Sequence, residues 1–282
     1  MKPQVKSLTF GLLGYPIKHS LSPSMHNAGL RSLKIKARYK LFEVNFEKLA
    51  EFFLNIKKKN IRAFNVTIPY KEKVIPYLNS LSVGAQEIGA VNTVVVSRNG
   101  KLKGFNTDYL GFAGHLKELK VKPYRVAIIG AGGAAKAVCF ALAKMKVLEL
   151  CIYDIDKFKS LSLFKRLSSN FAHTRFDVAT RIEDLKIGQK DLLINATPVG
   201  MHSGDPCLIN ESWLHKGLFV YDLIYDPAET KLISLARKYG LNCSNGLGML
   251  LYQGVFAFKY FTGKKPPVKI MQEALIKGAQ KI

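Results

Sequence analysis

A glycine-rich turn, VAIIGAGGAAKA, carries the clearest chemical motif in the sequence. Its glycines, Gly130, Gly132 and Gly133, follow a β-rich run and precede a helix-like stretch, and Ala135 stands where the third motif glycine is often alanine. Glycines permit a sharp turn and a close backbone approach, and a helix N-terminus offers free amides to a pyrophosphate. The pattern therefore predicts a dinucleotide-binding turn rather than a purely structural one.

The next β-rich run, LELCIYD, ends in an acid, Asp154. A carboxylate at this place accepts hydrogen bonds from the adenosine ribose and repels a 2′-phosphate. Lys157 and Lys159 follow it and could pair with such a phosphate, although flexible lysines on a solvated helical turn are more often surface residues. These charges leave both NAD and NADP open, with Asp154 expected to outweigh the two lysines because the sheet fixes it.

The first half of the chain carries polar residues near the ends of expected strands, where the sites of open sheets gather. Two hydroxyls one residue apart, together with helix-start amides, suit a carboxylate. Taken singly, a lone lysine is a surface charge, and Asp108 is as readily a helix cap as a catalytic group. The residues are Ser20 and Ser22 in GYPIKHSLSP, Thr67 and Lys71 in NVTIPYK, Asn92 in AVNT, and Asp108 in NTDYLGF.

Strand-like and helix-like stretches alternate in the second half and predict parallel crossovers in a doubly wound sheet. The strands are expected over residues 126–130, 148–154, 191–197 and 217–223. The first half adds strands over 8–14, 37–44 and 61–68, a helix opening at Ser22-Pro23 with a hydroxyl cap, and a hairpin turning at Asn99-Gly100. Two helical stretches follow Asn245.

The fold class is therefore α/β, with an N-terminal substrate-binding α/β domain and a Rossmann-like dinucleotide-binding domain. The first domain is expected to comprise residues 1–112, with residues 246–282 packing back on it, and the second to comprise residues 113–245. The boundary would fall within a helix from Asp108 to Lys120.

The composition excludes several classes of protein. The 43 Lys and Arg against 20 Asp and Glu give a net charge of +23, but the lysines are spread along the chain, so a nucleic-acid partner is not expected. No segment reaches the ~20 apolar residues of a membrane span, which predicts a cytoplasmic protein without a membrane partner. The four cysteines form no CxxC pair and no histidine lies at zinc-ligand spacing, so we expect core thiols and no metal.

Eight motifs in order resemble the shikimate dehydrogenase family over essentially the whole chain: GYPIKHSLSP, NVTIPYK, AVNT, NTDYLGF, IGAGGAAKA, NATPVGM, YDLIY and GLGMLLYQG. The resemblance implies reversible hydride transfer between a nicotinamide cofactor and shikimate or 3-dehydroshikimate, within aromatic amino acid (chorismate) biosynthesis. It implies that Lys71 is catalytic and moves the hydroxyl proton, with Asp108 aligning it on the same substrate hydroxyl. Either charge state of Lys71 at pH 7 is compatible with this.

The resemblance also assigns the binding residues. It implies that Ser20 and Ser22 hold the substrate carboxylate. The ring hydroxyls would meet Thr67, Asn92, Asp108 and Gln253, with Tyr225 nearby. The expected cofactor residues are Gly130, Ala131, Gly132, Gly133, Ala134, the loop residues Asp154, Ile155, Asp156 and Lys159, and further on Thr197, Leu223 and Gly246.

The sequence departs from the family pattern at the cofactor loop. Many members carry an Asn-Arg-Thr type loop whose arginine and threonine meet the 2′-phosphate of NADP, whereas this chain has Asp154-Ile155-Asp156. The cofactor is thus NADP or NAD, and the loop favours NAD or mixed use. An NAD-using quinate/shikimate dehydrogenase is the alternative, and a nucleotide-sensing or nucleic-acid-binding protein is a remote one. A monomer and a homodimer both fit.

Overall fold

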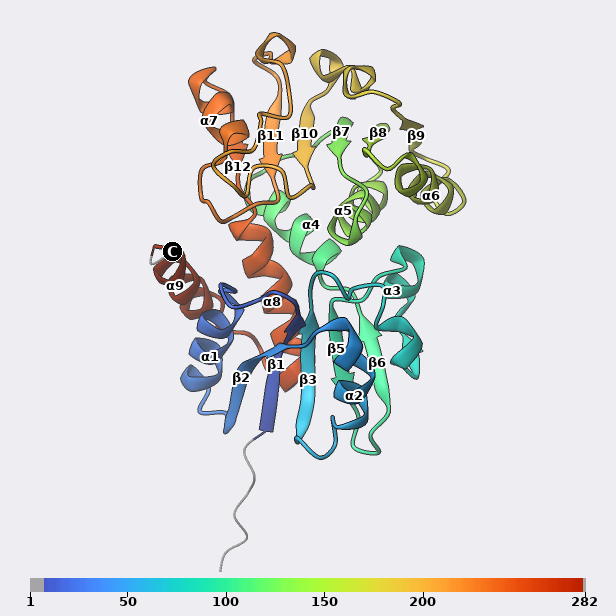
Figure 1. Cartoon of the computed structure of the whole chain (residues 1–282). Coiled ribbons are helices and arrows are strands. Elements are labelled where there is room, and N and C mark those ends of the chain that lie inside the picture. The colour runs from blue at the N-terminus through green and yellow to red at the C-terminus, as the bar shows by residue number, and fades with distance from the viewer. Residues whose placement is uncertain (1–7, 281–282) are drawn as a thin grey trace, which may run out of the picture. The chain divides into compact units, whose positions relative to one another are not determined.

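The computed structural model describes residues 8–280, which form two compact units (Figure 1). The first unit runs up to Gly111 and resumes at Leu251, and the second spans Phe112–Leu250. Both divisions fall inside helices, namely α4 (Asp108–Glu118) and α8 (Leu247–Thr262). Each unit is built on one six-stranded sheet.

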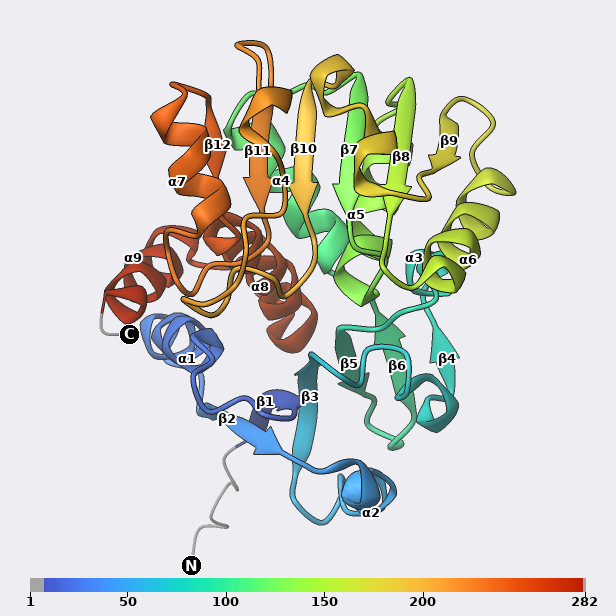
Figure 2. The same cartoon turned by 45° about the horizontal axis from the view of Figure 1, so that its top comes forward.

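The sheet of the first unit has the strand order β2-β1-β3-β5-β6-β4. Its parallel strands β2, β1 and β3 are continued by the antiparallel hairpin of β5 and β6. Helices α1 and α9 pack against each other beside the sheet (Figure 2). The strands are β1 (Leu8–Gly14), β2 (Ala37–Glu43), β3 (Ile61–Val66), β4 (Ser80–Leu81), β5 (Thr93–Val96) and β6 (Leu102–Phe105), and the helices are α1 (Ser22–Ser32), α2 (Leu49–Leu54), α3 (Val83–Ile88) and α9 (Val268–Ala279), with short 3₁₀ helices η1 (Phe46–Lys48) and η2 (Ile75–Tyr77).

The almost continuous burial of β1 and β3 is typical of strands inside a sheet that is covered on both faces. Leu13, Phe64 and Val66 are fully or almost fully buried and pack in one cluster with Phe52 of α2. Burial of such side chains stabilises a fold by about 1.5–3 kcal/mol each. The centre of the sheet is therefore a rigid platform, and the chain segments that leave β3 and β5 start from fixed positions.

The sheet of the second unit is entirely parallel, with the order β12-β11-β10-β7-β8-β9 (Figure 2). Numbered from β7, this is the doubly wound order 3-2-1-4-5-6 read from the opposite edge, and it confirms the predicted Rossmann-like fold. Helix α6 packs on β8 and β9, and α7 on β11 and β12. The elements are β7 (Arg125–Ile129), α5 (Gly133–Lys144), β8 (Glu149–Tyr153), α6 (Lys157–Ser168), β9 (Arg175–Val178), η3 (Ile182–Leu185), η4 (Ile187–Gln189), β10 (Leu192–Asn195), η5 (Glu211–Trp213), β11 (Phe219–Asp222), α7 (Lys231–Lys238) and β12 (Cys243–Ser244).

The predicted hairpin turn at Asn99-Gly100 is confirmed, since β5 and β6 pair around it, Gly100 has a φ of 85° and its amide donates to the Ser97 carbonyl. Two local predictions need correction. The hydroxyl of Ser22 does not cap α1, because its N-cap residue is Leu21; the hydroxyl of Ser20 instead accepts a hydrogen bond from the Ser22 amide. Cys207 is exposed and is not a core thiol.

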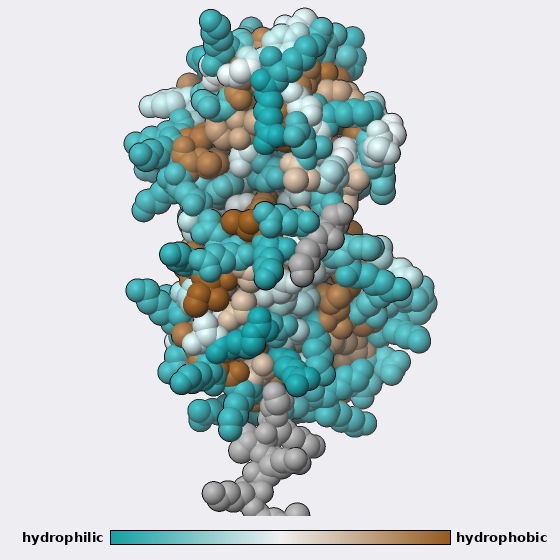
Figure 3. Space-filling view, turned by 90° about the vertical axis from the view of Figure 1, so that its left-hand side faces the viewer, coloured by the Kyte–Doolittle hydropathy of each residue, from teal (hydrophilic) through white to brown (hydrophobic). Residues whose placement is uncertain are grey.

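The described surface is that of a highly charged protein. Hydrophilic residues cover most of the face shown in Figure 3, and hydrophobic residues form separate patches on it. Within residues 8–280, no helix has the length and apolar character needed to cross a membrane.

Candidate functional site

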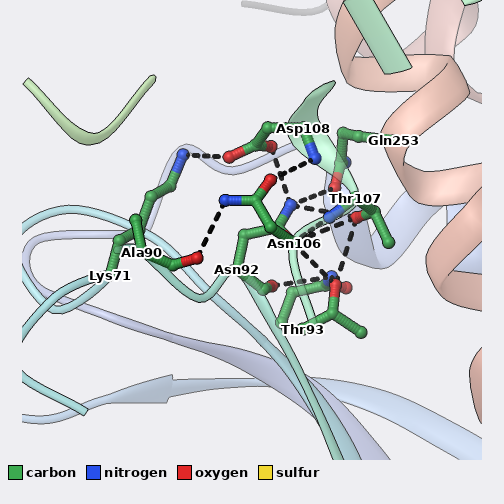
Figure 4. A network of polar contacts seen from close by, with 9 residues as sticks. Lys71, Ala90, Asn92, Thr93, Asn106, Thr107, Asp108 and Gln253 are labelled. Atoms are coloured by element: carbon green, nitrogen blue, oxygen red, sulfur yellow. Dashed lines mark hydrogen bonds and ion pairs between the residues drawn. The ribbon is translucent and has the colours of Figure 1, made fainter. Parts of the chain in front are cut away.

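An ion pair between Lys71 and Asp108 lies at the centre of the polar site in the first unit (Figure 4). The Lys71 Nζ and the Asp108 Oδ2 are 2.6 Å apart, and their side chains are 14% and 7% exposed. Lys71 follows β3, and its carbonyl accepts a hydrogen bond from the Val91 amide, which holds its backbone against the segment that enters β5. The pair is thus sheltered, and Lys71 is the more exposed of its two side chains.

Asn92 contacts the other oxygen of the Asp108 carboxylate. Its Nδ2 donates to Asp108 Oδ1 at 2.7 Å, and its Oδ1 accepts from the Thr107 backbone amide at 2.6 Å. A backbone amide can only donate, so this contact orients the Asn92 side chain with its NH₂ group toward Asp108. The Asp108 carboxylate therefore lies between two donors of fixed direction.

Gln253 joins this network from α8. Its Oε1 lies 3.4 Å from Asn92 Nδ2, and its side chain is almost fully buried. The close packing of α4 and α8 here depends on a glycine, because a Cβ on Gly111 would lie 2.6 Å from the Gln253 backbone nitrogen. Lys71, Asn92, Asp108 and Gln253, predicted from four separate motifs, are thus brought together.

Asn106 fixes the start of the helix that carries Asp108. Its Oδ1 accepts a hydrogen bond from the Asp108 amide at 3.0 Å, and its Nδ2 donates to the Ala90 carbonyl at 3.0 Å. An Asn that bonds the amide two residues on forms a local turn of its own. Both contacts are buried, so Asn106 ties the first residue of α4 to the chain before β5 (Figure 4).

The two serines lie near the N-terminus of α1. Ser20 is half-buried and Ser22 is buried. Thr67 follows β3 beside the end of β1, and the space for it depends on Gly14, where a Cβ would lie 2.5 Å from the Thr67 Cγ2. Among the contacts described within residues 8–280, none joins either serine directly to the Asn92 network, and none joins the Thr67 side chain to Lys71.

The predicted dinucleotide turn has the geometry that its glycines require. Gly130 has a φ of 106°, and a Cβ there would lie 2.9 Å from the Ala196 backbone. A Cβ on Gly132, in contrast, would meet nothing within 4 Å, so the space beside this residue is open. Helix α5 begins at Gly133 and leaves its first amides without intrahelical partners. Open space beside a helix N-terminus fits a pyrophosphate group.

Asp154 is bound to this turn directly. One carboxylate oxygen accepts from the Ala131 amide at 2.7 Å, and the other accepts from the Asp156 amide at 2.8 Å. Asp156 in turn caps α6 by accepting from the Phe158 amide, and it lies 3.5 Å from the Lys159 amine in an exposed ion pair. Contacts with backbone amides therefore fix the carboxylates of Asp154 and Asp156, whereas the Lys159 amine offsets the negative charge of Asp156.

A buried cluster of polar side chains holds the start of the loop that follows β10 in place. Thr197 donates its hydroxyl to Asn195 Oδ1 at 2.7 Å, and Asn195 donates to Asp222 Oδ1 at 3.0 Å. Burial raises the pKa of the Asp222 carboxyl, and hydrogen bonds from Thr230, Ile224 and Asn195 oppose that rise. The cluster joins the carboxyl ends of β10 and β11, where ligands of parallel sheets bind.

The remaining predicted residues follow β11. Leu223 and Gly246 lie in contact, because a Cβ on Gly246 would lie 2.0 Å from the Leu223 carbonyl oxygen. Tyr225 is half-buried, and burial raises the pKa of its phenol. It belongs to the second unit, whereas the other predicted substrate residues belong to the first.

Sequence reasoning missed the residues that hold the predicted ones in place. All but Tyr39 and Thr230 lie inside the quoted motifs, as Asn65 in NVTIPYK, Thr93 in AVNT and Asn195 in NATPVGM, but nothing in their spacing distinguishes them. In residues 8–280, no three His, Cys, Asp or Glu side chains gather as metal ligands. The missed residues are Tyr39, Asn65, Thr93, Asn106, Thr107, Asn195, Asp222 and Thr230.

Comparison with known proteins gives concordant matches over the chain. Residues 12–94 match the shikimate dehydrogenase substrate binding domain, and residues 246–276 match the shikimate 5′-dehydrogenase C-terminal domain. A shikimate dehydrogenase (NADP(+)) from Caldanaerobacter subterraneus subsp. tengcongensis is 42% identical over 269 residues, covering 94% of this chain and 95% of the relative.

Two solved structures are similar in fold and carry bound cofactors. Shikimate 5-dehydrogenase from Listeria monocytogenes, in complex with shikimate and NAD, has a TM-score of 0.87 at 34% identity and covers 98% of both chains. Quinate dehydrogenase from Corynebacterium glutamicum, in complex with NAD, has a TM-score of 0.88 at 32% identity and covers 96% of this chain and 99% of its own.

Replacement of Asn106 tests how the site is supported. Asn106→Ala removes both side-chain contacts and leaves the Ala90 carbonyl and the Asp108 amide buried without them. We expect the free energy of unfolding to fall by about 1–3 kcal/mol, the cost of unsatisfied buried groups. Asn106→Asp keeps the acceptor for the Asp108 amide and serves as the matched variant. Equal stability of Asn106→Ala and the wild type in urea unfolding would contradict this role.

Proposed function

The chain belongs to the shikimate dehydrogenase family, and we propose that it catalyses the reversible oxidation of shikimate to 3-dehydroshikimate with a nicotinamide dinucleotide. The observation that carries the proposal is the sheltered ion pair of Lys71 and Asp108, with Asn92 donating to the second carboxylate oxygen. A binding module on the same fold would need no amine, carboxylate and amide arranged in this way.

The reaction requires a base beside the substrate hydroxyl. As the carbon gives up hydride and its hydroxyl becomes a carbonyl, the hydroxyl proton must leave. Lys71 in its neutral form takes that proton, and in the reverse direction the ammonium returns it. Asp108 aligns the amine, since its Oδ2 lies 2.6 Å from Nζ, and it contacts the same hydroxyl.

The other polar residues orient the ring. Asn92 and Gln253 present amide groups, and Thr67 a hydroxyl, to the ring hydroxyls, with Tyr225 as a further contact. Ser20 and Ser22 bind the carboxylate together with amides at the start of α1, where the helix dipole favours an anion. Several directional contacts are needed because a reacting carbon must be held close to its attacking geometry.

The nicotinamide dinucleotide supplies the hydride acceptor or donor. The residues that would hold it fit the group, because the space beside Gly132 is open and α5 starts at Gly133. We assign its pyrophosphate to the turn from Gly130 to Ala134. The neighbouring loop residues Thr197, Leu223 and Gly246 complete the cofactor site. Its adenosine ribose is assigned to Asp154 and the loop through Ile155, Asp156 and Lys159.

The loop after β8 favours NAD or mixed use over NADP. Asp154 is held by two backbone amides, so its charge cannot swing away from a ribose 2′-phosphate. Lys159 is paired with Asp156, and both side chains are exposed, which weakens this lysine as a phosphate partner. Ile155, almost fully exposed, offers no charge.

An NAD-using quinate/shikimate dehydrogenase is the second candidate. The same loop favours it, and a quinate dehydrogenase in complex with NAD is among the similar structures. Rates with shikimate and quinate, each with NAD and NADP, measured by nicotinamide absorbance, separate the two candidates. We also propose that the enzyme works in the cytoplasm, as a monomer or a homodimer, without a nucleic-acid partner.

Lys71→Ala tests the catalytic assignment. We expect kcat to fall about 100-fold or more, the lower range of what a positioned proton-transfer group contributes, with little change in the KM of the cofactor. Lys73→Ala is the matched control, because Lys73 lies two residues on with its amine over the Phe46 ring. Unchanged turnover of Lys71→Ala would remove Lys71 from the mechanism.

Exchange of the loop tests the cofactor preference. The wild type should show a higher kcat/KM with NAD than with NADP, or similar values. The double substitution Ile155→Arg with Asp156→Thr keeps a residue that can cap α6, removes a negative charge and adds a guanidinium. The ratio of kcat/KM with NADP to kcat/KM with NAD should therefore rise about tenfold or more. Ile155→Gln with Asp156→Thr is the uncharged control. A strong NADP preference of the wild type would refute this interpretation.

A further inference from the structure

Tyr39 of β2 contacts α1 through two neighbouring helix residues, His26 and Asn27. The Asn27 side chain pairs with the Tyr39 backbone, donating to its carbonyl and accepting from its amide, each at 2.9 Å. The His26 ring stacks on the Tyr39 ring with centroids 4.3 Å apart and planes 2° from parallel. The helix that begins at Ser22 is therefore held on β2 in part by the ring and the backbone of Tyr39.

The His26 ring acts only as a packing surface. Neither ring nitrogen has a hydrogen-bonding partner among residues 8–280, and burial lowers its pKa to about 3. A neutral ring that stacks on Tyr39 and faces Phe258 and Phe261 gives this contact a fixed plane. The polar link from α1 to β2 at this point is consequently the Asn27 amide and not the imidazole.

The direction of the hydrogen bonds through the phenol follows from a backbone contact. The Asn65 Nδ2 donates to the Asn92 carbonyl at 3.1 Å, and a carbonyl can only accept. The Asn65 Oδ1 must therefore face Tyr39, whose hydroxyl donates to it at 2.8 Å. The phenol proton is therefore committed to Asn65.

The same chain continues to the amide of Asn92. Asn65 Nδ2 also donates to the Thr93 hydroxyl at 3.0 Å, and Thr93 donates to the Asn92 Oδ1 at 2.9 Å. These contacts are buried, so water does not compete for them. A directed series thus runs from the Tyr39 phenol through Asn65 and Thr93 to Asn92, the residue that holds Asp108.

We infer that Tyr39 is a positioning residue that sets the separation between the carboxylate-binding serine, Ser22, and the hydroxyl-binding Asn92. The inference rests on the proposed function, in which these two residues bind opposite ends of one rigid ring. Because shikimate cannot stretch to fit, an error in their spacing weakens binding at both ends. Tyr39 itself is 3% exposed, so it acts through its neighbours.

Tyr39→Phe is the first test, because it removes the hydroxyl and keeps the ring stack. We expect the KM of shikimate to rise about fivefold to tenfold, which is the effect of one net hydrogen bond, with the KM of the cofactor unchanged. Tyr221→Phe is the matched control in the second unit: Tyr221 is equally buried and its hydroxyl lies 2.5 Å from His115 Nδ1. It should lower the unfolding temperature without raising the KM of shikimate.

A double-mutant cycle separates positioning from general loosening of the fold. In a Ser22→Ala background the helix that Tyr39 holds no longer presents this serine to the carboxylate. An error in its separation from Asn92 then matters less, so Tyr39→Phe should raise the KM of shikimate less than twofold. Additive effects of the two substitutions, or an unchanged KM in Tyr39→Phe alone, overturn the inference while the proposed function stands. A wild-type protein without shikimate-dependent activity overturns the proposed function, and this inference with it.

Discussion

The first unit depends on how the carboxylate of Asp108 is satisfied. A buried carboxylate is costly unless it is paired and hydrogen-bonded, and here one oxygen meets the Lys71 amine and the other the Asn92 amide. Both donors belong to segments that adjoin central strands of the sheet, because Lys71 follows β3 and Asn92 precedes β5. The pair is thus held by the fold, while the amine keeps the exposure that a proton-transfer group needs.

In the second unit, too, buried or half-buried carboxylates join separate parts of the chain. Asp154 binds the glycine turn through the Ala131 amide, so the end of β8 and the turn after β7 are joined before any ligand arrives. Asn195 and Asp222 join the next two strand ends in the same way. Such preorganisation reduces the ordering that a dinucleotide would impose on these loops when it binds.

Much of this architecture could be predicted from the sequence. The part that could not be predicted depends on contacts between segments that are distant in the sequence. The alternating strands and helices and the glycine turn are local patterns, and the parallel sheet follows from them. Lys71 and Asp108 stood out only as members of motifs. Tyr39 has no such signal, since a tyrosine in ARYKLFE is an ordinary strand residue until α1 packs on it. The Ser22 cap failed because Ser22 is already the first residue of α1, one position beyond the N-cap.

A crystal structure of the protein with shikimate tests the central claim most directly. The account predicts one ring hydroxyl oxygen within hydrogen-bonding distance of both Lys71 Nζ and the Asp108 carboxylate, with the substrate carboxylate at Ser20 and Ser22. A complex in which the carboxylate lies against Lys71, or in which no ring hydroxyl reaches both Lys71 and Asp108, would contradict it.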